Sequence, residues 1–333
     1  MNLPTQTIIR YTIIIPVKAI NAYMRETVHH IRNLQRDDWE LIILPNEPDA
    51  DEWHDSRIGI IPSGKVGPAA KRDIGAQHAN GDILVFLDDD SYPEPDLLDV
   101  AEYYFADENV VALGGPAMTP PDDTFWQRVS GAVFLSKLSG GIPERYIPIG
   151  KVRPVDDWPS VNLMVRKDAF LAIGGFNSPY WPGEDTKLCL DLIQKTGKQI
   201  LYVPEMRVWH HRRAGLIAHL KQVGAYGLHR GYFAKKYPET SFKPLYFIPS
   251  AFLLFAIMSA FLPLMPAAAR NLFLAGWAVY GFSLLLALAD LLKYEGVLVS
   301  LSALPYVFLT HLVYGARLLQ GFALTRDLVS ELR

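Results

Sequence analysis

The sequence predicts an α/β domain with a mostly parallel sheet, followed by a C-terminal region of membrane helices. Short apolar runs alternate with helical patterns up to about residue 213, which is typical of parallel strands joined by crossover helices. Three long apolar stretches follow residue 243. The 333-residue chain has a net charge of −3, and this balance gives no indication of a nucleic-acid partner. Its one cysteine, Cys189, excludes an intramolecular disulfide and a cysteine-based zinc cluster.

Each strand is expected where a short apolar run lies between turn-forming residues, and each helix where apolar residues recur every three or four positions. The strands expected in this way are 11–17, 40–44, 58–61, 82–87, 110–114, 161–166 and 199–203. The helices expected between them are about 21–35, 66–79, 95–106, 125–138 and 184–196. The helix at 125–138 carries an apolar stripe, which fits a core helix, an acceptor groove or a helix that dips into a membrane.

Residues 214–243 are expected to form an amphipathic linker. They mix basic residues with apolar ones at helical spacing, as in helices that lie on a membrane surface. An ordinary amphipathic helix packed on the domain is the alternative. The basic residues also favour a cytoplasmic position for this side of the protein.

Residues 244–333 are expected to contain about three membrane helices. The runs Pro244–Ala269 and Asn271–Ala289 have no charged residue, and Gly296–Ala316 has only His311. Each run is close to the roughly 20 apolar residues that span a bilayer. A buried helical bundle is the alternative, but successive runs with tryptophan and tyrosine among them favour a multi-pass membrane region. Three spans would place the C-terminus on the side opposite the α/β domain.

The most distinctive local pattern is a strand that ends in acids. The apolar run Ile83–Leu87 is followed at once by Asp88, Asp89 and Asp90. Adjacent carboxylates repel one another unless a cation neutralises them, and oxygen ligands suit a hard divalent ion. The ion would lie beyond the carboxyl end of a strand, where open α/β sheets bind ligands. A solvated acidic turn is the alternative.

A second acidic cluster, Glu184 and Asp185, begins a predicted helix after a Pro-Gly pair. A carboxylate in such a place serves as a general base if it lies within hydrogen-bond reach of a hydroxyl nucleophile. Simple electrostatics at a helix N-terminus is the alternative.

Two basic clusters complete the candidate chemistry. Lys71 and Arg72 lie near the start of the helix before the acid-bearing strand, where a helix N-terminus suits an anion such as a diphosphate. An amphipathic helix with a basic face is the alternative. His210 and His211 precede Arg212; histidines at a strand end can ligate a metal and arginine can bind phosphate. A juxtamembrane basic cluster is the alternative.

The order of these blocks resembles that of the GT-A glycosyltransferases, and in particular the inverting, membrane-associated enzymes of family 2. The resemblance spans about residues 11–213 and implies a GT-A-like, Rossmann-like fold. Four segments carry it: TIIIPVKAINAYMRETVHHI, GPAAKRDIGAQHANGDILVFLDDDSYPEPD, VNLMVRKDAFLAIGGFN and GEDTKLCLDLIQKTGKQILYVPE.

The resemblance implies a role for each acid. Asp88 and Asp90 match the outer acids of the family's DxD motif, which holds Mg²⁺ or Mn²⁺ on the donor diphosphate. Asp89 would contact the ribose or sugar, or stay structural. Asp185 matches the acid that deprotonates the acceptor hydroxyl, with Glu184 as the alternate base or an acceptor-binding group.

The resemblance also implies a second set of ligands. His210 or His211 is similar to the histidine that follows the core in many GT-A enzymes, near the metal or diphosphate. The family usually has an acid soon after the proline of the first strand, but here Pro16 is followed by Val17, Lys18 and Ala19. Asn46 stands where the family usually has an aspartate at the end of the second strand, so the nucleobase stays open. The donor-binding positions implied in this way are Pro16, Asn46, Lys71, Arg72, Asp88, Asp89, Ser160, Asn162 and Arg212.

With the membrane helices, the resemblance implies a glycosyltransferase of bacterial envelope or exopolysaccharide synthesis. It would be anchored in the inner membrane with its catalytic domain in the cytoplasm. Its partners would be a nucleotide-sugar donor, a lipid-linked or polysaccharide acceptor and membrane lipids, with a homo-oligomer as an option. A metal-dependent nucleotidyltransferase and a non-catalytic nucleotide-binding membrane scaffold are the alternatives.

Overall fold

The computed structural model describes residues 10–48 and 53–328. Residues 1–9 of the predicted catalytic domain and 329–333 of the predicted membrane region lie outside the described residues. The described chain forms two compact units: 10–48, 53–118 and 147–210 make the first, and 119–146 and 211–328 make the second. The expected domain of residues 1–213 is therefore interrupted, because residues 119–146 fold with the C-terminal helices.

An eight-stranded sheet forms the centre of the first unit, in the order β3-β2-β1-β4-β9-β6-β10-β8. The pairs β3-β2, β2-β1, β1-β4 and β6-β10 are parallel. β9 is antiparallel to β4 and β6, and β8 is antiparallel to β10. The predicted mostly parallel α/β sheet is thus confirmed. Its strands are β1 (Tyr11–Pro16), β2 (Trp39–Leu44), β3 (Ile58–Ile60), β4 (Ile83–Leu87), β6 (Val110–Gly114), β8 (Arg153–Val155), β9 (Asn162–Arg166) and β10 (Gln199–Tyr202).

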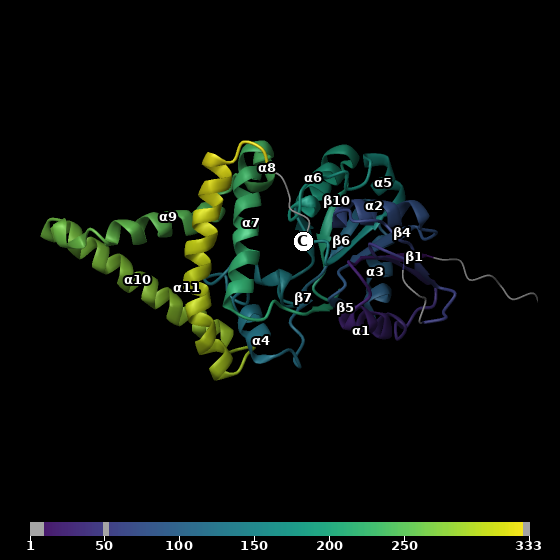
Figure 1. Ribbon diagram of the computed structural model, residues 1–333, viewed down its shortest axis with the longest axis horizontal. Coiled ribbons are helices and arrows are strands. Elements are labelled where there is room, and N and C mark those ends of the chain that lie inside the picture. The colour runs from purple at the N-terminus through teal and green to yellow at the C-terminus, as the bar shows by residue number, and fades with distance from the viewer. Residues whose placement is uncertain (1–9, 49–52, 329–333) are drawn as a thin grey trace, which may run out of the picture. The chain divides into compact units, whose positions relative to one another are not determined.

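Helices cover both faces of this sheet (Figure 1). Alternate residues of a strand point to opposite faces, and β1 is apolar along most of its length because both of its faces are buried. Ile13 and Ile15 pack with α1 (Ala22–Ile31) and α3 (Leu97–Phe105). Ile14 packs on the other face, which is covered by α2 (Pro68–His78), α5 (Lys167–Ile173) and α6 (Glu184–Thr196).

A second, three-stranded sheet has the order β5-β11-β7. It consists of β5 (Ser91–Pro93), β7 (Ala117–Met118) and β11 (Val208–His210), three short strands that the sequence did not predict. β11 pairs antiparallel with β5, so that His210 lies opposite Ser91. The chain that leaves β4 is thereby brought next to residues 208–210.

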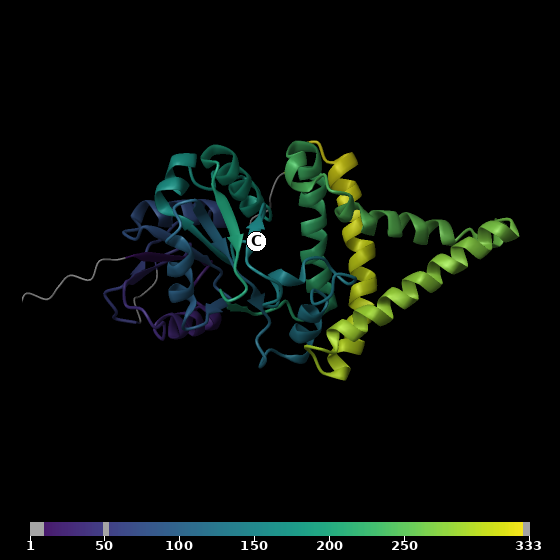
Figure 2. The ribbon, with the colours of Figure 1, turned by 180° about the vertical axis from the view of Figure 1, so that it is seen from behind.

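The second unit is helical (Figures 1 and 2). The middle of the chain supplies α4 (Phe125–Ala132) and the 3₁₀ turn η1 (Pro143–Arg145). The C-terminal part supplies α7 (Leu216–Lys236), α8 (Pro238–Ser241), α9 (Pro244–Ser259), the 3₁₀ turn η2 (Leu262–Leu264), α10 (Ala267–Leu291), α11 (Val297–Leu319) and the π-helical turn η3 (Gln320–Leu324). α4 packs against α7 and α11. Val129 and Val133 of its stripe are buried while Phe125 and Trp126 are exposed, so one side of α4 belongs to a core.

α7 and α11 lie side by side in both views (Figures 1 and 2). Glycines permit the close approach: a Cβ added to Gly231 would lie 2.1 Å from the Leu318 carbonyl oxygen, and one added to Gly321 would lie 2.0 Å from that of Leu228. The predicted amphipathic linker is therefore a helix packed along its length on a C-terminal helix.

Two of the described helices are long and apolar enough to cross a membrane, namely α10 and the helix Val297–Leu324 that contains α11. The first predicted run, Pro244–Ala269, gives only the 16-residue helix α9 and then η2. Pro263 and Pro266 lack the N–H that a continuing helix would need. The three expected spans thus become two candidates and one shorter apolar helix.

Candidate functional site

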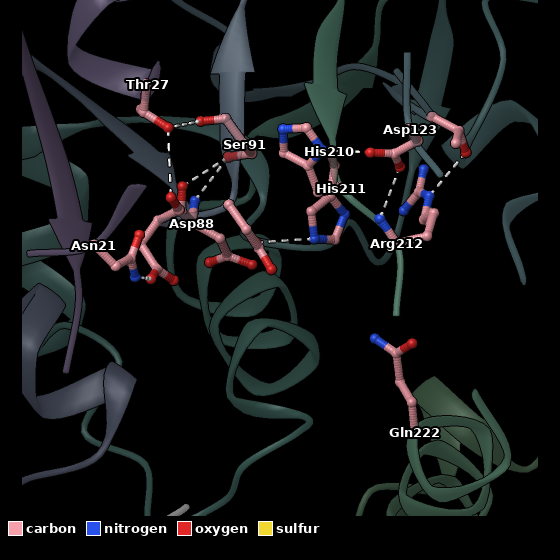
Figure 3. A network of polar contacts seen from close by, with 12 residues as sticks. Asn21, Thr27, Asp88, Ser91, Asp123, His210, His211, Arg212 and Gln222 are labelled. Atoms are coloured by element: carbon pink, nitrogen blue, oxygen red, sulfur yellow. Dashed lines mark hydrogen bonds and ion pairs between the residues drawn. The ribbon is translucent and has the colours of Figure 1, made fainter. Parts of the chain in front are cut away.

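The acid cluster lies in a tight turn after β4 (Figure 3). The Asp88 N–H donates to Ser91 Oγ (3.0 Å), and the Ser91 hydroxyl donates to the Asp88 carbonyl (2.9 Å). Asp89 is held by a neighbouring helix, because its Oδ2 accepts a hydrogen bond from Nδ2 of Asn21 (2.8 Å), the N-cap residue of α1. Asp88 and Asp90 are thereby left as the candidate metal ligands of the cluster.

A histidine from β11 completes a three-residue group with these acids. His210 Nε2 lies 3.1 Å from Asp90 Oδ1 (Figure 3). One potential ligand atom from each of Asp88, Asp90 and His210 lies within 4.8 Å of the other two. The strand register accounts for this meeting, since His210 lies opposite Ser91, the residue after Asp90.

The group has the composition of a divalent-cation site. Asp90 is only 6 % exposed, and a buried carboxylate beside a second one is unfavourable unless positive charge is near. The Arg72 guanidinium lies 2.6 Å from Asp88 and offsets part of that charge. Two carboxylates and an imidazole are ordinary ligands of divalent metals, so the residues present fit such an ion.

His211 and Arg212, expected at the metal or the donor, instead bind residues of the second unit. His211 Nδ1 lies 2.5 Å from Asp123 Oδ1, and Asp123 Oδ2 accepts the Arg212 N–H (3.2 Å). The Arg212 guanidinium donates to Thr119 Oγ1 (3.0 Å). β11 ends at His210, and side chains of consecutive residues in an extended segment point to opposite sides. Of the two histidines, the structure therefore groups only His210 with the acids.

Lys71 was expected to meet a diphosphate, but its side chain holds the ends of two strands together. Nζ donates to the carbonyls of Val17 (2.6 Å) and Leu44 (3.0 Å) and to Asn46 Oδ1 (2.7 Å). Burial lowers the pKa of Lys71 to about 8, which leaves it mostly protonated at pH 7. Lys71 thus orients Asn46 beside the end of β1, where Pro16 lies.

Arg72, also expected at the diphosphate, links the two acidic clusters. Its guanidinium is almost fully buried and donates to Asp88 Oδ1 (2.6 Å) and to Glu184 Oε1 (3.2 Å). It comes from the inner side of α2, which explains why it points into the unit and is not presented at the helix N-terminus. The Arg72 guanidinium therefore contacts both the predicted metal ligand Asp88 and Glu184 of the predicted catalytic pair.

Glu184 and Asp185, the first residues of α6, have different environments. Burial, reinforced by the adjacent Asp185, raises the pKa of Glu184 to about 8, although Arg72 opposes the shift. Asp185 accepts hydrogen bonds from the N–H groups of Thr186 (2.8 Å) and Ser160 (3.3 Å), and such donors stabilise a carboxylate. At neutral pH Glu184 keeps its proton, so Asp185 is the better placed of the two to accept one.

Ser160 and Asn162, expected among the donor-binding positions, make internal hydrogen bonds. Ser160 supports Asp185 through its backbone N–H. Asn162 is 1 % exposed, and its Nδ2 donates to the carbonyls of Pro116 (3.2 Å) and Met206 (2.7 Å). Asn162 therefore connects β9 to the segments that lead into β7 and β11.

Sequence reasoning missed three residues that organise these clusters. Asn21 holds Asp89, Ser91 closes the acidic turn and Asp123 binds His211. Asn21 had a recognisable signal, because an asparagine before an amphipathic run is a common N-cap. Ser91 and Asp123 had none, since their partners are fixed by the tight turn and by tertiary contact.

Residues 12–170 match the family described as Glycosyl transferase family 2. The chain is 27 % identical over 251 residues to a pre-mycofactocin glycosyltransferase of Mycobacterium tuberculosis, which covers 74 % of this chain and 52 % of the relative. It is 25 % identical over 155 residues to a glucosyl-dolichyl phosphate glucuronosyltransferase of Haloferax volcanii, which covers 43 % of this chain and 47 % of the relative. The chain thus spans about half the length of the curated relatives it matches.

Among solved structures, the chain is similar to a mannosyltransferase of Pyrobaculum calidifontis in complex with GDP-Man and Mn²⁺. The TM-score is 0.60 at 20 % identity, and the likeness covers 94 % of this chain and 87 % of the other. This likeness confirms the predicted GT-A-like fold. The family match ends at residue 170, so the roles of Asp185 and His210 depend on the geometry described above.

Proposed function

We propose that the protein transfers a sugar from a nucleotide-sugar to a membrane-associated acceptor, because residues 12–170 match the description Glycosyl transferase family 2. The acceptor is a lipid-linked glycan or a growing polysaccharide of the cell envelope. The reaction inverts the anomeric carbon in one displacement, with no covalent enzyme intermediate.

The observation that carries this proposal is the link between the metal-type group and the acidic pair of α6. Arg72 contacts Asp88 on one side and Glu184 on the other. A site that binds a diphosphate through a cation and also holds a carboxylate base has both parts that such a displacement needs.

Asp88, Asp90 and His210 are the proposed holders of the cation. Mg²⁺ and Mn²⁺ both accept carboxylate oxygens, and we favour Mn²⁺ because imidazole is a common ligand of transition metals. When bound, the ion neutralises negative charge on the donor diphosphate.

Asp185 is the proposed general base. Its carboxylate takes the proton of the acceptor hydroxyl, and the backbone N–H groups of Ser160 and Thr186 keep it oriented. Glu184 is protonated at neutral pH and bound to Arg72, so we assign it to positioning Arg72 and binding acceptor.

The donor is proposed to lie across the ends of β2, β1 and β4. The strand order turns at β1, which has β2 on one side and β4 on the other, and ligands of open α/β sheets bind at such a point. Pro16 and the Lys71–Asn46 pair mark the nucleobase end, while Asp88 marks the diphosphate end. Asp89, which accepts a hydrogen bond from Asn21, is proposed to line the donor site between the nucleobase end and the diphosphate end.

A membrane-associated acceptor is proposed from the apolar helices of the second unit. The two curated relatives have different acceptors by name, so they do not choose between acceptor classes for this chain. The described C-terminal region contains two helices of membrane-spanning length and a shorter apolar one. The basic residues of α7 favour a cytoplasmic side for catalysis, in the inner membrane.

The test is release of nucleoside diphosphate by the purified full-length protein in lipid. A panel of nucleotide-sugars is supplied with Mn²⁺ or Mg²⁺, with and without a glycolipid extract. Asp90→Asn and Asp185→Asn should each lower the rate of release from the active donor by at least about 10²-fold. Asp37→Asn, at an exposed surface position, is the matched control and should behave as wild type.

Two results would refute the proposal. Release of pyrophosphate from a nucleoside triphosphate would indicate a nucleotidyltransferase. Donor binding without turnover across a broad acceptor panel would indicate a non-catalytic scaffold.

A further inference from the structure

The helices α9 and α10 expose a continuous apolar surface. No charged side chain occurs in residues 244–269 or 271–289, and only 6 % of the most apolar part of α10 is buried. Both helices contribute large exposed side chains, among them Ile248, Leu254, Ile257, Leu272, Val279 and Phe282. Exposed apolar surface of this extent indicates a contact with lipid or with another protein.

Aromatic contacts show that α9 and α10 form an antiparallel hairpin. Phe252 stacks on Tyr280 with ring centroids 4.2 Å apart, and Phe255 lies 5.4 Å from Trp277 and 5.0 Å from Phe273. From Phe252 to Phe255 of α9 the residue number rises, while the number of the residue contacted in α10 falls from 280 to 277 and 273. This order is expected of two helices that run in opposite directions. The tip of this hairpin, residues 260–266, includes the exposed Leu264.

The far end of the hairpin is fastened to the segment 119–146. Arg128 forms an ion pair with Glu295 in the turn after α10 (2.5 Å), and the Ser136 hydroxyl donates to Asp290 (2.8 Å). Both ends of the segment 119–146 continue into the α/β unit. The end of α10 therefore lies on the same side of a membrane as that unit, as does the start of α9, which follows the basic helix α7.

The second candidate span, α11, packs on α9 near Pro249 and Ser250, and also on α4 and α7, which carry charged side chains. Tyr306, in the first half of α11, stacks on Trp126 of α4. α4 also carries Arg128, which binds the end of the hairpin. Its second half runs parallel to α7: Thr310 bonds to His219 (2.8 Å), and the Thr325 carbonyl accepts a hydrogen bond from Lys235 (2.6 Å).

If α11 crossed the bilayer, α7 would have to enter it alongside. α7 carries Lys221 and Arg230 before its last turn and Lys235 and Lys236 in its last turn, and a charge near the centre of a membrane helix costs about 2.5–3.5 kcal/mol or more. The hairpin has no such difficulty. Its two charged residues lie near its ends: Asp290 is in the last turn of α10, where Ser136 binds it, and Arg270 is in the first turn near the tip, where a long side chain can extend toward headgroups.

We infer that α9 and α10 enter the bilayer as a hairpin whose two ends lie on the catalytic side, while α11 and α7 lie together at the membrane surface. The described C-terminal end of α11 is then on the same side as the α/β unit, whereas three spans would place it on the opposite side. This inference rests on the proposed membrane anchoring, but it is independent of sugar transfer.

The test is labelling of single-cysteine variants with a membrane-impermeant maleimide, in sealed membrane vesicles of both orientations. Tyr103→Cys reports the side of the α/β unit, Leu324→Cys the end of the C-terminal helix and Leu264→Cys the hairpin tip; all three positions are exposed. The wild type, whose only cysteine is buried, supplies the blank.

We expect Tyr103→Cys and Leu324→Cys to react in vesicles of the same orientation. Leu264→Cys should be protected in those vesicles until detergent is added. Reaction of Leu324→Cys only in the opposite orientation would overturn the inference, because α11 would then cross the membrane.

Reaction of Leu264→Cys together with Tyr103→Cys in intact vesicles would also overturn it. So would complete extraction of the protein by alkaline carbonate, which would indicate that a second copy or another protein covers the hairpin. Nucleoside-diphosphate release measured on the same samples separates these failures from failure of the proposed sugar transfer.

Discussion

At the scale of single residues, the adjacent acids Glu184 and Asp185 have different environments. Glu184 is buried, whereas Asp185 accepts hydrogen bonds from backbone N–H groups. Glu184 is enclosed and protonated at neutral pH, while Asp185 accepts two backbone hydrogen bonds. Environments that separate neighbouring carboxyl groups in this way commonly separate their roles. Sequence alone left both acids as candidate bases, because burial of one member of the pair is a tertiary property.

The first prediction concerns these two acids. Asp185→Asn should lower kcat by about 10²–10⁴-fold, the usual contribution of a general base. Glu184→Gln should lower it by less than about tenfold, since glutamine keeps the hydrogen bond to Arg72 and the protonated acid does not act as base. Steady-state kinetics at pH 7 measure both. An equal loss in the two variants would contradict the assignment.

The second prediction is a pH dependence of stability. The pKa of Glu184 is raised from 4.5 to about 8, so between these values the folded state holds a proton that the unfolded state has lost. The stabilisation is complete below about pH 4.5 and is lost as the pH rises through 8, with a slope of at most about 1.4 kcal/mol per pH unit.

Glu184→Gln removes this titration. The difference in melting temperature between wild type and Glu184→Gln, measured in detergent from pH 5 to pH 9, should therefore shift steadily against the wild type up to about pH 8. If the difference in melting temperature is constant across this pH range, Glu184 has the same pKa in the folded and unfolded states, which would contradict the prediction.

The third prediction separates the two histidines. His210→Ala removes one member of the Asp88–Asp90–His210 group and should weaken Mn²⁺ binding at least about tenfold, in the range seen when metal sites lose supporting groups. His211→Ala should leave Mn²⁺ affinity unchanged but lower the melting temperature, because it leaves the buried Asp123 without this partner. Mn²⁺ titration followed by electron paramagnetic resonance decides, and weaker binding in the His211 variant alone would reverse the assignment.

At the scale of elements, the regular part of the fold could be predicted and the parts that build the site could not. β1, β2, β4, β6 and β9 are mostly apolar and almost entirely buried, so their sequences are distinctive. β5 and β11 have three residues each, which is too short for a period to be visible. Their pairing is what brings His210 to Asp90.

The fourth prediction concerns the packing of α7 on α11. Gly231→Ala would place a Cβ 2.1 Å from a backbone oxygen of α11, and relief of such a clash typically costs about 1–3 kcal/mol. The matched control is Gly281→Ala in α10, where nothing lies within 4 Å of the added atom. Melting temperatures in detergent should fall for Gly231→Ala only. A similar effect of both changes would indicate a general response to losing a helical glycine.

At the scale of the whole molecule, the boundary expected at residue 213 divides segments that fold together. α4 of the middle segment packs on α7 and α11, Ser130 bonds to His219 of α7 (2.8 Å), and Arg128 pairs with Glu295 (2.5 Å). No local pattern marks residues 119–146 as part of a C-terminal unit. Their partners lie about 90–170 positions away along the chain and are chosen only by the tertiary fold.

The fifth prediction follows from this interruption. A chain truncated after Arg213 should aggregate, although it contains every residue of the predicted catalytic domain. α4, which carries the fully buried Val129, would lose its contacts with α7 and α11, and a fully buried valine contributes about 1.5–3 kcal/mol. Arg128 and Ser130 would lose their partners as well.

Coexpression of residues 214–333 as a separate chain should restore a soluble, detergent-purified complex, because the lost contacts are non-covalent. Size-exclusion chromatography of both preparations measures the outcome. A monodisperse, cooperatively melting truncated chain would show that residues 119–146 do not need the C-terminal helices to fold.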